Sequence, residues 1–298
     1  MTFRGDISRS GGKARKGGGG GRGMAVGGGL GGLLLVGLFV LLGGNPAQIP
    51  DMLGQGEGQG QGQAQLDTGE TFDHCQTGED ANTYDDCRLL FTMNSTTAMW
   101  KEVLPTQAGM EYEEPGLVDF EGSTQSGCGF ASASTGPFYC PTDKEAYFDT
   151  SFFDQMRQFG GEDAPFAQMY IVAHEIGHHV QNLEGTLGLS NYNDPGADSN
   201  AVMVELQADC YAGIWASYAD KGPDRMLEPI TEEQLDAALT TAAAVGDDNI
   251  QRRSGGEVNP ESWTHGSSEQ RRQAFLDGYT TGQMSSCDYL DRGVYRTT

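Results

Sequence analysis

The sequence predicts an α+β fold, mainly helical with a small sheet, behind an N-terminal transmembrane helix. Most of the chain after residue 72 consists of stretches with apolar residues at helical spacing, whereas only two short stretches resemble strands. Roughly the first seventy residues are rich in glycine and polar residues and cannot form a core. They also contain one uncharged apolar run of about the length that crosses a bilayer.

The N-terminal region has the composition of a membrane anchor. Residues 1–23 are glycine-rich and carry six basic residues against one acid, and residues 24–42 carry no charge. A cleaved signal peptide has the same order, but this apolar run is long and no clear small-residue cleavage site follows Leu42. The positive-inside rule places the basic arm, residues 1–23, in the cytoplasm. We therefore expect a single-pass protein of the cell membrane, with the chain after residue 42 extracytoplasmic.

The rest of the chain divides into a linker and one domain. Residues 43–71 contain an imperfect Gly-Gln repeat that buries nothing, which is typical of a flexible tether. The folded domain is expected over residues 72–298. The chain has 42 acidic and 18 basic residues, and this acidity argues against a nucleic-acid partner. The sequence lacks the glycine motifs that bind phosphates, so no nucleotide is expected either.

Six cysteines follow the apolar run, and an even number in this position suits an oxidising compartment. Sequence alone does not fix their pairing. The arrangement with the lowest entropic cost of loop closure joins nearest neighbours along the chain. Its pairs are Cys75–Cys87, Cys128–Cys140 and Cys210–Cys287.

The expected elements follow in order. A helix over residues 84–104 ends at Pro105, and two short strands over 117–120 and 146–149 flank the Cys128–Cys140 loop. The next helix, 164–183, begins with Pro165 in its first turn and ends at Gly185. A polar loop leads to the last three helices, the third of which Ser267 or Ser268 can cap. These helices cover residues 203–219, 232–245 and 267–278.

The helix over 164–183 contains the sequence His174-Glu175-Ile176-Gly177-His178. Histidines four residues apart lie on the same helical face and can bind one metal ion. Glu175 lies where it can take a proton from a water molecule activated by that ion. Two ordinary histidines on a helix are the alternative. The apolar stripe around the motif favours the metal, because it holds this helix firmly in a core.

A catalytic zinc ion usually has three protein ligands. Glu205, on the next strongly helical stretch, is the expected third ligand. Asp209 lies one turn later on the same face, where it can accept the free N–H of a ligand histidine. An exposed acidic pair is the alternative, but the apolar residues around Glu205 and Asp209 argue against it.

These motifs and several others resemble the "Putative neutral zinc metallopeptidase" family. The resemblance covers roughly residues 98–287 together with the basic start and its apolar run. It implies a zincin of the gluzincin type with one zinc ion per chain, and a strand at the edge of the substrate cleft. Residues 147–149 are the candidate for this strand, and an ordinary buried strand is the alternative there. The resemblance also favours His265 as a donor to the developing oxyanion, with a helix-capping or surface histidine as the alternative. Arg271 would be a companion that aligns a carboxylate such as Asp209. The matching segments are residues 126–129, 136–141, 172–185, 205–215, 244–248 and 264–271.

The expected function is zinc-dependent hydrolysis of peptide bonds, with a peptide or protein as substrate. His174, His178 and Glu205 hold the ion, and Glu175 and His265 act on the substrate. The alternative is an inactive zincin-like module that binds peptides or cell-envelope partners. Glu175 argues against that alternative, because a purely structural zinc site needs no base.

Overall fold

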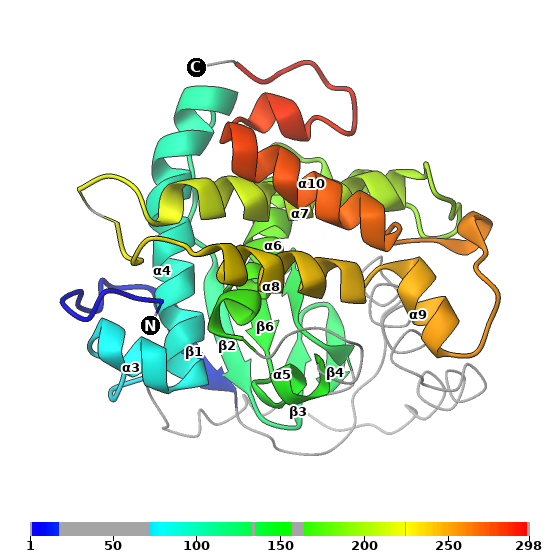
Figure 1. The fold of residues 1–298 in the computed structure, drawn as a ribbon. Helices are drawn as coiled ribbons and strands as arrows, with labels where there is room; N and C mark the ends of the chain where they lie inside the picture. Colours follow the sequence, from blue (N-terminus) through cyan, green and yellow to red (C-terminus); the bar gives the residue numbers. More distant parts are fainter. Residues whose placement is uncertain (1, 18–71, 133–134, 157–163, 224, 297–298) are drawn as a thin grey trace.

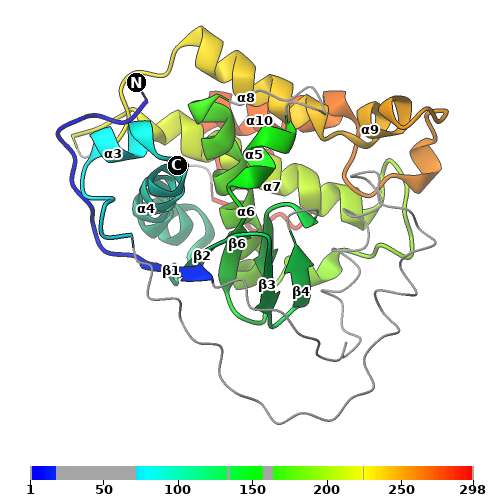
Figure 2. The same cartoon turned by 90° about the horizontal axis from the view of Figure 1, so that it is seen from below.

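The computed structural model describes residues 2–17, 72–132, 135–156, 164–223 and 225–296. Helices and a small sheet form the predicted α+β fold (Figures 1 and 2). The long helix α6 runs along the sheet, and α7 and α8 pack against α6. The helices are α3 Gly78–Thr83, α4 Asp85–Val103, α5 Ser151–Met156, α6 Pro165–Glu184, α7 Asn200–Ala219, α8 Glu232–Ala244, α9 Asp247–Arg253 and α10 Ser268–Thr281. Short helical turns cover Leu104–Ala108, Leu187–Leu189, Pro260–Ser262 and Met284–Cys287.

The main sheet has the strand order β1-β2-β6-β5. Strands β1, β2 and β6 are parallel, whereas β5 pairs with β6 in the antiparallel sense. Strands β3 and β4 form a separate hairpin. The bounds are β1 Lys13–Gly17, β2 Gly116–Phe120, β3 Ser123–Ser126, β4 Gly129–Ser132, β5 Phe138–Cys140 and β6 Glu145–Phe148.

The strand expected at the cleft edge lies inside the sheet. β6, which contains Tyr147 and Phe148, is hydrogen-bonded to β2 on one side and to β5 on the other. The prediction of residues 147–149 as an edge strand is therefore wrong. The three-residue strand β5, which the sequence pattern did not reveal, is the last strand on that side within the described residues.

The N-terminal residues also differ from expectation. Residues 2–17, predicted to be part of a separate cytoplasmic arm, lie against the domain, and β1 is a strand of its main sheet (Figure 2). Phe3 belongs to the core. The domain thus includes residues well before its expected start at residue 72. The expected anchor, residues 24–42, and the expected linker, residues 43–71, lie outside the described residues. No helix among those described could span a membrane.

The ends of the two ligand-bearing helices are fixed by local sequence. Pro165 occupies the first turn of α6, and Gly185 ends this helix in the left-handed conformation with φ 75°. The Ser199 hydroxyl accepts the backbone N–H of Val202 and so caps α7. Ser267, one of the two predicted caps, is the N-cap of α10 and forms a capping box with Gln270.

Helices α7 and α10 cross in backbone contact at two glycines. A Cβ atom on Gly213 of α7 would lie 2.0 Å from the carbonyl oxygen of Phe275. One on Gly278 of α10 would lie 1.9 Å from that of Cys210. No side chain fits at either position, so the two helices are locked together at this crossing.

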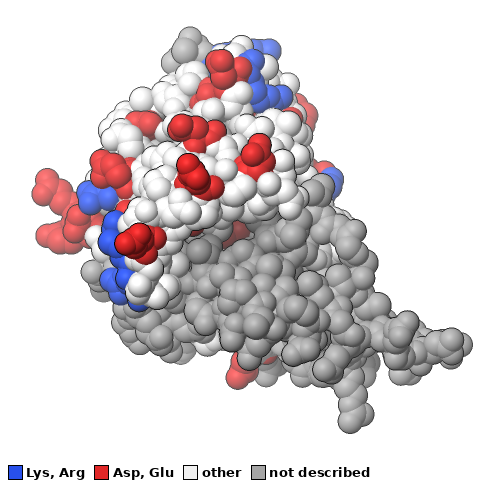
Figure 3. Space-filling view, turned by 90° about the vertical axis from the view of Figure 1, so that its right-hand side faces the viewer, with Lys and Arg blue, Asp and Glu red and all other residues white. Residues whose placement is uncertain are grey.

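Three disulfides join the cysteines in the nearest-neighbour order that the sequence favoured. Cys75–Cys87 fastens the segment before α3 to α4, and Cys128–Cys140 joins the β3–β4 hairpin to β5. Cys210–Cys287 holds α7 to the C-terminal segment. On the face in Figure 3, acidic side chains are spread over the described surface, with basic ones among them.

Candidate metal centre

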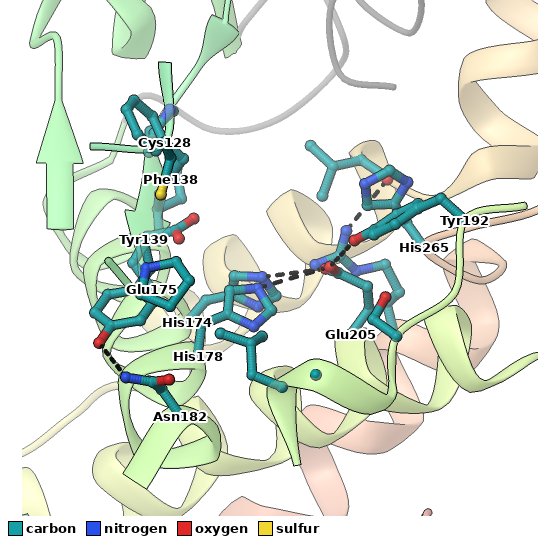
Figure 4. Close-up of a pocket in the computed structure, with 18 of the residues that line it drawn as sticks. Cys128, Phe138, Tyr139, His174, Glu175, His178, Asn182, Tyr192, Glu205 and His265 are labelled. Carbon is teal, nitrogen blue, oxygen red and sulfur yellow. Dashed lines mark hydrogen bonds and ion pairs between the residues drawn. The ribbon is translucent and has the colours of Figure 1, made fainter. Parts of the chain in front are cut away.

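His174 and His178 of α6 face Glu205 of α7 at the bottom of a pocket (Figure 4). The Glu205 carboxylate oxygens lie 3.4 Å from Nε2 of His174 and 3.7 Å from Nε2 of His178. The three ligand atoms lie within 4.8 Å of one another, and all three residues are buried. The structure thus brings the three predicted ligands together around one point.

The other ring nitrogen of each histidine has a partner that accepts a hydrogen bond. Nδ1 of His174 lies 2.8 Å from Oδ1 of Asp209, and Nδ1 of His178 lies 2.8 Å from Oε1 of Gln181. In the neutral rings these Nδ1 atoms carry the proton. The Nε2 lone pairs then point toward the Glu205 carboxylate, so acceptors face acceptors with no proton between them. A cation bound at this point would satisfy all of them. This donor set of two imidazoles and one carboxylate suits zinc.

Electrostatics at this point also favours a positive charge. Burial lowers the pKa of His174, but the charge of Asp209 and hydrogen bonds to Asp209 and Glu205 outweigh it and raise the pKa to about 10. Burial raises the pKa of Glu205, yet the two histidines hold it well below its usual value. The point at which these three side chains meet therefore favours a cation, which is a proton when no metal ion is bound.

Asp209 is the centre of a buried network behind His174. It is 0% exposed and accepts hydrogen bonds from Nε and Nη2 of Arg271, at 2.7 and 3.0 Å, and from the Tyr170 hydroxyl. Burial raises its pKa, but Arg271 and His174 dominate and lower it to about 2. The structure places Arg271, on α10, against Asp209 and not at the metal ligands.

Gln181 is a residue that sequence reasoning missed. Its amide group is fixed by two donated hydrogen bonds, to the Val204 carbonyl at 2.7 Å and to Oε1 of Gln207 at 3.0 Å. Gln207 in turn donates to the carbonyl of Cys287 and to the hydroxyl of Tyr295. The orientation of His178 is therefore tied through two glutamines to the C-terminal segment. The spacing of three residues from His178 was the available signal.

Glu175 lies on α6 beside the ligands, lines the same pocket and is 7% exposed. Burial raises the pKa of its carboxyl group, and the nearby histidines oppose this. A carboxylate with a raised pKa is suited to taking up a proton near neutral pH. His179, by contrast, faces away from the ligands and bonds Tyr139 and the carbonyl of Glu113.

His265 lies on the opposite side of the pocket from β5 (Figure 4). Its turn is built on Asp247, whose Oδ2 accepts the backbone N–H groups of Thr264, His265 and Gly266 at 2.8, 2.7 and 3.0 Å. Burial lowers the pKa of His265, but Asp247 and Glu205 raise it above its usual value. Asp247 was not among the predicted site residues, although it lies in one of the family-like motifs.

Tyr192 is another unpredicted member of the site. It comes from the loop between α6 and α7, and its hydroxyl donates to Oε1 of Glu205 at 3.4 Å. Its ring centre lies 6.5 Å from that of His265. The loop appeared from its sequence to be a simple polar connection, but it supplies a hydroxyl group beside the third ligand.

The pocket has a cavity volume of about 300 Å³. Phe138 and Tyr139 of β5 form one wall, and Tyr192 and His265 form the other, with the histidines between them (Figure 4). The Cys128–Cys140 disulfide lies at the β5 wall. The arrangement is a buried set of metal ligands at the base of a pocket with apolar and polar walls.

Comparison with known proteins shows the family to which this chain belongs. The family model described as "Putative neutral zinc metallopeptidase" matches residues 5–290. The uncharacterized protein Rv2575 of Mycobacterium tuberculosis is 49% identical over 226 residues, which cover 74% of this chain and 75% of the relative. The uncharacterized protein YpfJ of Escherichia coli K12 is 37% identical over 238 residues, which cover 77% and 80%. No solved structure matches. The chain belongs to the family of putative neutral zinc metallopeptidases, whose name fits the three ligands and the adjacent Glu175 of its pocket.

Proposed function

We propose that this protein is a zinc-dependent peptidase that binds one zinc ion through His174, His178 and Glu205. The observation that carries the proposal is the coincidence of this ligand set with Glu175 in one pocket. A site that only needs to hold a structural ion has no use for a buried carboxylate beside the ligands. Zinc, when bound, would lower the pKa of a water molecule and polarise a substrate carbonyl group.

Glu175 would act as the general base and then as the general acid. Its carboxylate takes a proton from the attacking water and later gives it to the leaving amine of the substrate. Burial raises the pKa of Glu175, which supports this role. A carboxyl group with a raised pKa can both accept and release a proton near neutral pH.

His265 would stabilise the negative charge that develops on the substrate carbonyl oxygen. The Asp247 carboxylate favours the protonated imidazole, and a protonated ring is the stronger donor. Tyr192 lies on the same wall, where its hydroxyl donates to the Glu205 carboxylate. Donors placed at a developing oxyanion contribute about 2.7–4 kcal/mol each.

The substrate would be a peptide in extended conformation. β5 pairs with β6 on one side only in the described structure, and it forms a wall of the pocket. An extended peptide can therefore add to its free edge as a further strand, with side chains alternating toward and away from the pocket.

The test is a comparison of wild type with Glu175→Gln in the full chain. The variant should keep its zinc and still bind peptide, because Glu175 is not a ligand. Cleavage of a peptide library should fall about 10²–10⁴-fold, the usual loss of general-base catalysis. Glu184→Gln is a matched control, since Glu184 is a buried glutamate of the same helix that does not line the pocket.

Three measurements decide the outcome. Metal analysis should find one zinc ion per chain in wild type and none in His174→Ala. Equal cleavage by Glu175→Gln and wild type would refute the mechanism. If zinc-loaded wild type binds peptides but cleaves none across a broad library, the protein is a binding module and not a peptidase.

A further inference from the structure

We infer that residues 2–17 are a permanent part of the folded domain and that β1 covers the edge of β2 in the main sheet. The N-terminus and the metal centre must then lie on the same side of any membrane that the chain meets. This inference does not depend on the proposed function, because it concerns a surface away from the pocket.

Phe3 anchors the first part of this segment. It is 1% exposed and packs edge-on against Phe91 of α4, with ring centres 5.8 Å apart. The side chain of Asn82 accepts the backbone N–H groups of Thr2 and Phe3 and donates to the Phe3 carbonyl, at 2.8–2.9 Å. One asparagine thus satisfies three backbone groups of the segment, which indicates a specific seat.

Leu227 and Gly78, in two other parts of the domain, also contact this segment. The backbone of Phe3 bridges to Leu227 in the antiparallel sense. At the start of α3, Gly78 donates its backbone N–H to the Ile7 carbonyl at 3.1 Å. A Cβ atom on Gly78 would lie 1.9 Å from the carbonyl oxygen of Arg4. The glycine therefore leaves the space that the segment occupies.

The end of the segment completes the main sheet. Lys13–Gly17 pairs in parallel with Gly116–Phe120, and all five residues of that β2 strand are buried. Without β1, β2 would be an exposed edge strand whose backbone N–H and C=O groups have lost their partners.

Lys16 supplies the positive charge that pairs with two neighbouring carboxylates of the domain. Its Nζ lies 2.6 Å from a carboxylate oxygen of Asp86 and 2.6 Å from one of Asp119, which is only 5% exposed. It also lies 4.7 Å from the centre of the Phe72 ring. Removing Lys16 would leave two neighbouring carboxylates without their common cation, which is costly for a buried group.

These contacts decide a question of topology. A single membrane crossing between residues 17 and 72 would place β1 and β2 on opposite sides, and neighbouring copies with the same orientation could not exchange their segments. The expected orientation, with residues 1–23 in the cytoplasm and the domain outside, is therefore incompatible with the pairing of β1 and β2. The N-terminal segment and the rest of the domain therefore lie on the same side of any membrane that the protein meets.

The direct test labels one cysteine on each part in intact cells that make the full chain. Ser10→Cys and Glu233→Cys both replace exposed residues, the first in the N-terminal segment and the second on α8. A membrane-impermeant maleimide should either label both variants or label neither, with both labelled after lysis. Labelling of one variant and not the other in intact cells would overturn the inference.

A second test measures whether the segment supports the domain. In the purified full chain, Phe3→Ala should lower the unfolding temperature by on the order of 10 °C, as expected for an emptied aromatic site in a domain of this size. Lys16→Ala should also lower it by several degrees. Lys13→Ala is the matched control on the same strand, because Lys13 is exposed, and it should leave the temperature unchanged.

Zinc content should be unaffected in all three variants, so the inference and the proposed function can fail separately. An unfolding temperature of Phe3→Ala and Lys16→Ala equal to that of wild type would overturn the inference, because it would show that the segment contributes nothing to the fold.

Discussion

Replacing Asp209 with asparagine should weaken both the fold and the metal site, by amounts that the structure lets us work out. The substitution keeps the shape of the side chain and removes its charge. Arg271, which is 4% exposed, would then face a neutral amide in place of its carboxylate. His174 would lose the anionic acceptor that fixes its Nδ1 proton.

Two independent estimates give the loss of stability. Removing one partner of a buried ion pair costs about 3–5 kcal/mol, because the other charge stays buried. Burial raises the pKa of Asp209, but Arg271 and His174 lower it overall from 3.8 to about 2. That lowering corresponds to about 2–2.5 kcal/mol in favour of the carboxylate. With both in view, we expect a fall in unfolding temperature of about 6–15 °C for the metal-free variant.

The metal site should weaken separately. Loss of the carboxylate behind a ligand histidine typically lowers metal affinity about 10–100-fold. Calorimetry of the metal-free protein measures the first effect, and competition with a chelator for zinc measures the second. Asp236→Asn, an exposed aspartate on α8, is the control and should change neither quantity.

The pH dependence gives a further check. A carboxyl group whose pKa is lowered by folding stabilises the protein above its unfolded pKa and loses that contribution as pH falls through its folded pKa. The difference between wild type and Asp209→Asn should therefore shrink from about pH 4 toward pH 2. If the metal-free variant unfolds at the wild-type temperature at neutral pH, the buried network does not have the role argued for it.

Three more predictions concern neighbouring groups. Gln181→Leu should lower zinc affinity about 10–100-fold in chelator competition. Gln181→Glu, which keeps an acceptor for His178, should lower the affinity less. Equal losses in the two variants would contradict the role of Gln181 in orienting His178. Burial raises the pKa of Glu184 to about 7, so the folded protein holds a proton that the unfolded chain releases near 4.5. Wild-type stability should therefore fall as pH rises from about 4.5 to 7, and Glu184→Gln should abolish this slope in thermal unfolding. His265→Ala should lower kcat about 10²–10³-fold with little change in KM, and unchanged kcat would exclude His265 as an oxyanion donor.

The parts of this protein that could be predicted are those whose signal is local. The helix carrying His174 and the helix carrying Glu205 have apolar residues that mark their buried faces, and their ends carry ordinary stop and cap residues. The disulfides followed from the cost of closing loops. Helix α7 appeared as one continuous element for the same reason.

The missed elements depend on contacts that no local pattern reveals. β1 has the sequence Lys-Ala-Arg-Lys-Gly, which looks solvated. Its partners are a strand about a hundred residues away, two carboxylates around Lys16 and the Glu145 carboxylate beside Arg15. β5 has three residues and is too short to show an alternation. Tyr192 is in a polar loop, and nothing near it in sequence points to the pocket. Asp247 begins α9 within a family-like motif, but its contact with the turn of His265 joins residues 17 to 19 positions apart, which no local pattern shows.

The crossing of α7 and α10 at Gly213 and Gly278 has a consequence for how the protein acquires its metal. Glu205 and Asp209 lie on α7, and Arg271 lies on α10, so the backbone contact fixes three polar groups of the centre to one rigid unit. The unit is held by core packing and by Cys210–Cys287, none of which involves an ion. We therefore expect the proposed centre to form during folding, so that a folded apoprotein can take up zinc afterwards, unlike the zinc fingers whose folding requires the ion.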